Sequence, residues 1–89
     1  MNYRIEIDRQ ALKVLAALPK KAQRQIAERI DSLAEEPFPP DARQMRGQEA
    51  IWRIRSGSYR VAYTVQRNVL HILILRIADR KDFYRHFKR

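Results

Sequence analysis

The sequence predicts an α+β fold of the order βααβββα, with a twisted antiparallel sheet, an N-terminal helical hairpin on one face of it and a short C-terminal helix. Three patterns lead to this prediction. Polar and apolar residues alternate over residues 2–7, apolar residues recur at helical spacing over residues 9–36, and strand patterns surround a Gly-Ser pair over residues 52–77. The chain has 89 residues without an internal repeat or a linker, so we expect a single domain over residues 1–89.

The first strand and the two helices follow from apolar spacing and from the residues at their ends. Residues 2–7 have the period of two that is typical of a strand with one buried face. Asp8 is a suitable N-cap for a helix over residues 9–18. Pro19 ends that helix and suits the first turn of a second one over residues 20–36, which three further prolines terminate.

The second half of the chain predicts a long connection, a hairpin, a central strand and a last helix. Residues 38–50 form the connection, whose length is typical of functional or mobile loops. Residues 69–77 are apolar on both faces and indicate a central strand, which would place Leu73 and Leu75 on the face opposite to the helical hairpin. The C-terminal segment predicts a short helix that Asp79 caps and that covers part of that face.

The segment "WRIRSGSYRVAY", residues 52–63, predicts a β-hairpin and determines the face on which each arginine lies. If Gly57-Ser58 is a two-residue turn, Arg55 pairs with Arg60, and Arg53 lies on the same face. A three-residue turn would take an apolar residue out of the core, so apolar burial favours the first register. The side chains that this register directs to the core are Trp52, Ile54, Val61 and Tyr63.

Charge and composition indicate the class of partner. Lysine and arginine number 19 against 10 aspartate and glutamate residues, and the net charge of +9 favours a polyanionic partner: nucleic acid first, an acidic protein second, an anionic membrane third. The absence of cysteine excludes disulfides, a thiol nucleophile and cysteine-based zinc sites, and suits a reducing cytosol. No apolar run approaches the roughly 20 residues of a membrane helix, so we expect a cytoplasmic protein.

Three arginines on one sheet face suggest a binding site for phosphate. Arg55 and Arg60 repel each other across the hairpin, which costs stability unless an anion binds between them. A guanidinium group presents a planar fork of donors that matches phosphate oxygens. Arg80 and Tyr84, four residues apart on the last helix, would add a cation and an aromatic ring, a combination that suits single-stranded RNA. The alternative is that the tyrosine packs and the arginines are only solvated.

The order of these segments resembles the RelE/ParE superfamily of toxins from toxin–antitoxin pairs. The resemblance extends over nearly the whole chain, including "MRG", "WRIRSGSYRVAY" and the ending "RIADRKDFYRHF". It implies an endoribonuclease of the RelE-like branch, which cuts messenger RNA in the ribosomal A site without a metal or another cofactor. In that reaction the ribose 2′-oxygen attacks the adjacent phosphate.

The resemblance also implies roles for individual residues. Arg60 would clamp the scissile phosphate, Arg80 would donate to the departing 5′-oxygen, and Tyr84 would stack on or orient the nucleotide. The residues that fall on the catalytic pattern of the branch are Arg53, Arg55, Arg60, Arg80 and Tyr84. Those expected to add RNA contacts are Arg46, Lys81, Arg85 and Lys88.

The residue that accepts the 2′-hydroxyl proton is left open. Arginine keeps its proton and is a poor base, and this chain has Arg53 and Arg55 where lysines could serve. Lys81, Tyr84 and, more weakly, Glu49 are the candidates. Many relatives have a histidine in place of Asp79, for which the sequence favours a capping role.

Two other functions are compatible with the sequence. A ParE-like member would inhibit DNA gyrase without cleaving RNA, and a degenerate member would bind only RNA or an antitoxin. In each case the family resemblance implies a cognate antitoxin in a hetero-oligomer, and the charge of this chain predicts that the antitoxin is acidic where it makes contact. For the leading hypothesis the further partners are the ribosome and messenger RNA, and no membrane is involved.

Overall fold

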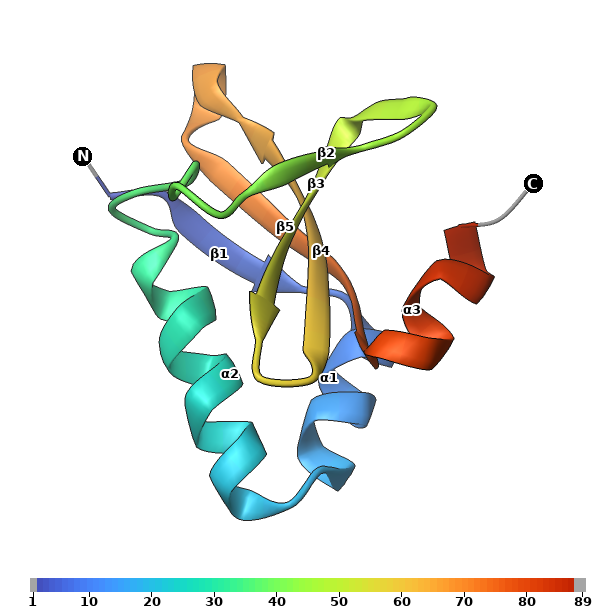
Figure 1. The fold of residues 1–89 in the computed structure, drawn as a ribbon. Coiled ribbons are helices and arrows are strands. Elements are labelled where there is room, and N and C mark those ends of the chain that lie inside the picture. Colours follow the sequence, from blue (N-terminus) through green and yellow to red (C-terminus); the bar gives the residue numbers. More distant parts are fainter. Residues whose placement is uncertain (1, 88–89) are drawn as a thin grey trace.

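The computed structural model describes the backbone of residues 2–87 and the side chains of residues 2–83 and 85 (Figure 1). It confirms the predicted α+β class. The elements are β1 (Arg4–Ile7), α1 (Arg9–Ala17), α2 (Lys20–Ser32), β2 (Arg43–Met45), β3 (Gln48–Ser56), β4 (Tyr59–Gln66), a 3-10 turn (Arg67–Val69), β5 (His71–Asp79) and α3 (Arg80–Phe87).

The five strands form one mixed sheet in the order β1-β5-β4-β3-β2. Strand β5 is interior, as predicted, with β1 on one side and β4 on the other. The prediction of a wholly antiparallel sheet is wrong in one respect, because β1 runs parallel to β5, from Arg4 opposite His71 to Ile7 opposite Ile74. The apolar period identifies a buried face but carries no information about strand direction, so the sequence could not distinguish the two pairings.

The segment predicted as an irregular connection contains regular structure. Strand β2 and the first three residues of β3 lie within this segment, joined by a turn at Gly47, whose φ of 78° suits glycine. Of the three residues of β2, Arg43 and Gln44 are exposed and only Met45 is buried, so the strand shows no alternation that could reveal it in the sequence. The three prolines just before this strand favoured an irregular connection instead. The second helix also ends earlier than predicted, at Ser32.

The β3–β4 hairpin has the predicted register. Arg55 lies opposite Arg60, Ser56 lies opposite Tyr59, and Gly57-Ser58 is the two-residue turn. Gly57 has a φ of +61°, a conformation that residues with a side chain rarely adopt.

Gly57→Ala is expected to lower the free energy of unfolding by about 1–2 kcal/mol, the cost of a left-handed backbone at an L-residue. A Cβ at this position would meet no atom within 4 Å, so the loss comes from the backbone alone. Urea denaturation of the variant and of Ser58→Ala, the neighbouring turn substitution, measures it. A change in Gly57→Ala no larger than in Ser58→Ala would contradict this account of the turn.

Apolar side chains pack on both faces of the sheet. In Figure 1 the helical hairpin α1–α2 covers one face, and α3 extends from the end of β5 on the side of the molecule away from α2. The main core lies between α1–α2 and the sheet, and its fully buried residues include Ile26, Ile30, Ile54, Ile72 and Ile74. A smaller cluster of Met45, Ala62, Ala78 and Phe83 lies on the opposite face.

Two aspartates cap helices as predicted. The Oδ2 of Asp8 accepts a hydrogen bond from the N–H of Gln10 at 3.0 Å, and the Oδ1 of Asp79 accepts one from the N–H of Asp82 at 2.9 Å. Asp79 therefore begins α3 at a fixed point at the end of β5. In the part of the chain that the structure describes, no helix is long and apolar enough to cross a membrane.

Candidate functional site

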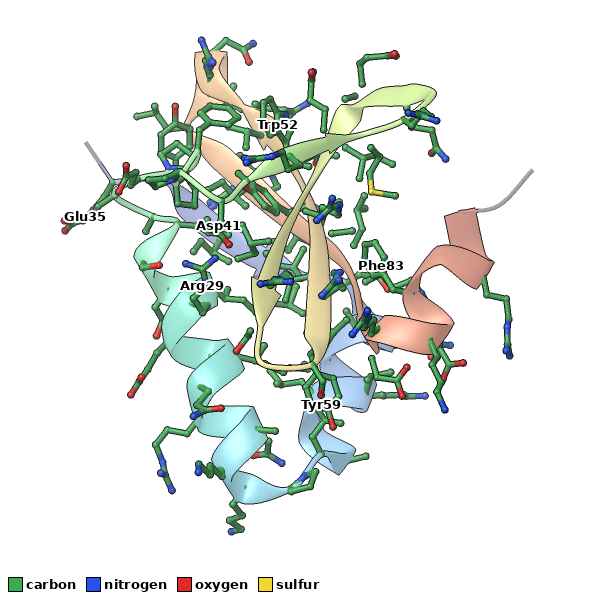
Figure 2. All side chains as sticks on the ribbon, in the orientation of Figure 1. Arg29, Glu35, Asp41, Trp52, Tyr59 and Phe83 are labelled. Atoms are coloured by element: carbon green, nitrogen blue, oxygen red, sulfur yellow. The ribbon has the colours of Figure 1, made fainter. Side chains whose placement is uncertain are left out.

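The sheet face opposite the helical hairpin carries the three hairpin arginines, and we call it the arginine face. Arg55 is directly opposite Arg60, and Arg53 is opposite Ala62, so these side chains leave the same side of the sheet. The residues between them on the two strands belong to the main core. Figure 2 shows nitrogen-tipped side chains gathered over the β3–β4 hairpin, between α2 and α3. The predicted placement of these arginines is confirmed.

Arg60 is the most buried charged side chain among the described residues. It is 9% exposed, and its Nε is buried without a hydrogen-bond partner. Within the described residues it forms no ion pair, whereas Arg55 on the neighbouring strand is exposed to water. A buried donor without an acceptor costs about 1–3 kcal/mol, so this arrangement is unfavourable for the isolated chain and favourable for binding an oxyanion.

Apolar side chains surround this part of the arginine face. Phe83 is fully buried and packs with Met45, Ala62 and Ala78. In Figure 2 it lies between α3 and the strands. The low polarity around Arg60 strengthens any electrostatic interaction that its guanidinium group makes.

The start of α3 lies beside the turn of the hairpin. The backbone N–H of Arg80 donates to the carbonyl oxygen of Ser58 at 2.9 Å. Asp79 pairs with Tyr59, next to Arg60 on β4. The structure thus brings Arg80, together with its exposed neighbour Lys81, to the same end of the sheet as Arg60.

The other residues expected to contact RNA are distributed differently. Arg46 is exposed in the β2–β3 turn, at the end of β3 away from Gly57, and so does not join the cluster. Arg85 is exposed on α3, with its Nη1 3.5 Å from a carboxylate oxygen of Asp82. The side chain of Tyr84 and the whole of Lys88 lie outside the described residues, so their predicted roles stay predictions.

Two of the candidates for the proton acceptor, Lys81 and Glu49, are exposed. Lys81 lies in the first turn of α3, close to the arginine cluster. Glu49 is the second residue of β3, at the end of the strand away from Gly57, and its carbonyl oxygen accepts a hydrogen bond from Gln44 at 3.0 Å. Position therefore favours Lys81 over Glu49.

The sequence prediction overlooked two arginines on this face. Arg43 of β2 lies opposite Arg53, and its Nη1 donates to the carbonyl oxygens of Pro40 and Ala42. Arg76 of β5 lies opposite Ala62, so it shares the face of Arg53 and Arg60. Its Nε is also buried without a hydrogen-bond partner. The signal in the sequence was a single charged residue within the apolar segment "HILILRIA".

An ion pair fixes the hairpin to α2. The Nη2 of Arg29 lies 2.7 Å from the Oδ2 of Asp41, and its Nε donates to the backbone carbonyl of Arg55 at 3.1 Å (Figure 2). Burial acts to raise the pKa of Asp41, but the hydrogen bond and charge of Arg29, with backbone hydrogen bonds, hold it below its ordinary value of 3.8. Burial raises the pKa of nearby Tyr63, whose hydroxyl donates to the carbonyl oxygen of Pro37 at 2.7 Å.

Asp41→Asn is expected to lower the free energy of unfolding at pH 7 by less than about 1 kcal/mol, because the carboxylate is 47% exposed and solvent weakens the pair. A lowered folded-state pKa means that this stability is present above the unfolded pKa of about 4 and is lost as the pH falls through the folded value. The urea midpoints of wild type and variant should therefore converge as the pH is lowered below about 4. Asp31→Asn on α2 is the control. A difference that persists in acid would contradict the assignment.

Comparison with solved structures identifies the class of this fold. The chain superposes on the RelE toxin in the archaeal RelE–RelB complex of Pyrococcus horikoshii with a TM-score of 0.80 and 36% identity, over 90% of this chain and 97% of the other. It matches a mutant of the E. coli toxin RelE in the free state with a TM-score of 0.78 and 21% identity, over 98% and 93% of the two chains. The architecture is that of a RelE-type toxin.

Sequence comparison gives the family. Residues 5–84 match the ParE toxin of the type II toxin–antitoxin system parDE. Over 97% of this chain and 99% of the relative, the sequence is 30% identical to RelE1 of Methanocaldococcus jannaschii, which is described as a candidate toxin. The chain belongs to the ParE toxin family, within the RelE/ParE toxin superfamily.

Proposed function

We propose that this protein is a ribosome-dependent endoribonuclease that cleaves messenger RNA, the toxin of a type II toxin–antitoxin pair. The observation that carries the proposal is the buried Arg60, whose Nε has no partner in the described chain and which lies among further arginines on the arginine face. Such a donor is already in position before the reaction. It can therefore stabilise the negative charge that develops on a phosphoryl oxygen without a rearrangement of the protein.

In the proposed reaction the ribose 2′-oxygen attacks the adjacent phosphorus. The bond from O2′ to phosphorus forms and the bond from phosphorus to O5′ breaks, which leaves a 2′,3′-cyclic phosphate and a 5′-hydroxyl. Arg60, with Arg53 and Arg55 beside it, stabilises the charge on the phosphoryl oxygens. Arg80 donates a hydrogen bond to the departing O5′, which takes a proton from water to become the 5′-hydroxyl, and Tyr84 orients the nucleotide. The 2′-hydroxyl proton passes to Lys81 or to a group of the ribosome.

When this protein is not bound to a ribosome, its proposed partner is an acidic antitoxin. RelE of Pyrococcus horikoshii was solved in complex with RelB, and the mycobacterial protein of the RelBE2 complex has the same fold, with a TM-score of 0.78 at 23% identity over 90% of this chain. A chain with a net charge of +9 binds most favourably to a segment of opposite charge. We propose a toxin–antitoxin hetero-oligomer in the cytoplasm, where the ribosomes are.

Cleavage on programmed ribosomes tests the enzymatic proposal. The full-length protein should cut a message bound to ribosomes and leave 5′-hydroxyl ends that polynucleotide kinase labels without prior dephosphorylation. A message with a single 2′-deoxynucleotide at the cut position is the matched control, because it lacks the nucleophile and should stay intact at that position. An intact wild-type message, or cleavage of the deoxy message at the same bond, would overturn the proposal.

Inhibition of DNA gyrase is the second candidate function, favoured by the match to the ParE toxin family over residues 5–84. A supercoiling assay with trapping of cleavage complexes distinguishes the two. A ParE-like protein would block supercoiling and leave ribosome-bound messages intact. The proposed ribonuclease would give the opposite result in both assays.

A further inference from the structure

Arg76 lies beside Arg60 on the arginine face and has no part in the function proposed above. Across the β4–β5 pair, Arg60 is opposite Ala78 and Ala62 is opposite Arg76. The two arginines are therefore diagonal neighbours, which lie roughly 7–8 Å apart in a sheet, a separation that long side chains can span. The other diagonal of the same square is formed by Ala62 and Ala78, on which Met45 and Phe83 pack.

Some guanidinium groups of the described residues have oxygen acceptors within the chain, and two buried ones have an Nε without any. Arg29 and Arg43 find oxygen acceptors within the chain: Asp41 for the first, and the carbonyl oxygens of Pro40 and Ala42, both at 2.9 Å, for the second. Arg60 and Arg76 differ, because each has a buried Nε with no hydrogen-bond partner among the described residues. These two atoms are the only buried side-chain donors or acceptors without a partner in the described part of the chain. Both lie on the arginine face.

A β-bulge directs Arg76 to this face. The pairing of β4 with β5 shifts by one residue between Ala62 and Tyr63, whose partners are Arg76 and Ile74, so Leu75 is the extra residue. Without the bulge, strict alternation would send Arg76 to the face that α1 and α2 cover. Bulges commonly re-aim a side chain beside an active site.

Asp8, an acidic residue at this edge of the sheet, does not neutralise Arg76. Asp8 lines the same hollow between α1 and β5 as Arg76 does. Its Oδ2, however, accepts the hydrogen bond from Gln10 that caps α1, and no ion pair joins the two residues. A second guanidinium thus stands next to the first without a counter-charge from the described chain.

We propose that Arg60 and Arg76 bind one phosphate group of the RNA together, with Arg76 as the second half of a two-guanidinium phosphate site. Each guanidinium presents a fork of N–H donors, so two of them can bind the non-bridging oxygens of one phosphodiester. The apolar cluster around Phe83 lowers the local polarity and strengthens both contacts. The identification of the anion as an RNA phosphate rests on the proposed function, whereas the pairing of the two arginines rests on the sheet register and the two buried Nε atoms.

Arginine Nε–Hε signals test the site directly in the full-length protein. In ¹⁵N-labelled protein, the signals lost in Arg60→Met and in Arg76→Met assign the two buried groups. Addition of a short 2′-O-methyl RNA, which the protein cannot cleave, should shift both signals together, and inorganic phosphate should shift them in the same direction at higher concentration. A response of Arg60 alone, or of neither signal, would overturn the proposal.

Affinity for the same RNA gives the second test. Arg76→Met should weaken binding about 10- to 100-fold, the loss expected for hydrogen bonds to a charged group. It should also reduce the slope of log K against log salt by about 0.7, one phosphate contact on a single strand. Arg24→Met, an exposed arginine on α2, should change neither value. Arg76→Lys keeps the positive charge but lacks the fork of guanidinium donors. It serves as the test variant if Arg76→Met disrupts strand β5.

The outcomes separate this proposal from the proposed function. If both signals respond and Arg76→Met weakens binding, but ribosome-bound messages stay intact, the phosphate site stands and the ribonuclease proposal fails. If messages are cleaved and Arg76→Met binds and cleaves like Arg24→Met, the ribonuclease proposal stands and the role of Arg76 is refuted.

Discussion

Arg60→Met is expected to reduce cleavage of ribosome-bound messenger RNA by about 100- to 1,000-fold, the usual effect of removing one donor that stabilises a developing oxyanion. The same substitution is expected to raise the free energy of unfolding, by up to about 1–3 kcal/mol, because it removes a buried Nε–H that has no acceptor in the described chain. Methionine is unbranched and flexible and can fill most of the vacated space among its apolar neighbours.

The opposite signs of these two effects make the prediction specific. Initial cleavage rates and urea denaturation curves are measured on the same preparations of wild type, Arg60→Met and the exposed control Arg24→Met. The control should match the wild type in both. A variant that loses activity and stability together would show that Arg60 supports the fold. A variant that keeps the activity would remove Arg60 from the mechanism.

The features that sequence analysis predicted correctly are those set by local patterns. The hairpin register follows from one glycine and four apolar residues, because a shift of one position would move all of them to the wrong face. The caps at Asp8 and Asp79 follow from side chains that accept hydrogen bonds from the nearby backbone. Each of these features is determined by residues that lie close to it in the sequence.

The features that were missed depend on contacts between distant segments. The parallel pairing of β1 with β5 joins residues near position 5 to residues near position 72, and no local pattern encodes its direction. The bulge at Leu75 changes the face of every later residue of β5, so a strict period of two places Arg76 on the wrong side. Sequence reasoning therefore located the arginine face and omitted Arg76 from it.

Phe83→Ala is expected to lower the free energy of unfolding by about 3–5 kcal/mol, the usual cost of removing a fully buried phenylalanine. Because a domain of this kind has a total stability of about 5–15 kcal/mol, the loss is a large fraction of it. Phe83 is the α3 side chain in the cluster with Met45, Ala62 and Ala78, so its truncation should also release the helix from the sheet. Cleavage should fall as well, since α3 carries Arg80.

Leu12→Ala provides the matched control for this substitution. Leu12 is 50% exposed on α1, so its truncation removes an apolar side chain without opening a cavity and should change stability by no more than about 0.5 kcal/mol. Urea denaturation measures the stability of both variants, and amide hydrogen exchange over residues 80–87 reports whether α3 stays docked. If Phe83→Ala lost less than about 1 kcal/mol and α3 stayed protected, the backbone bond from Arg80 to Ser58, rather than the apolar cluster, would be what holds the helix on the sheet.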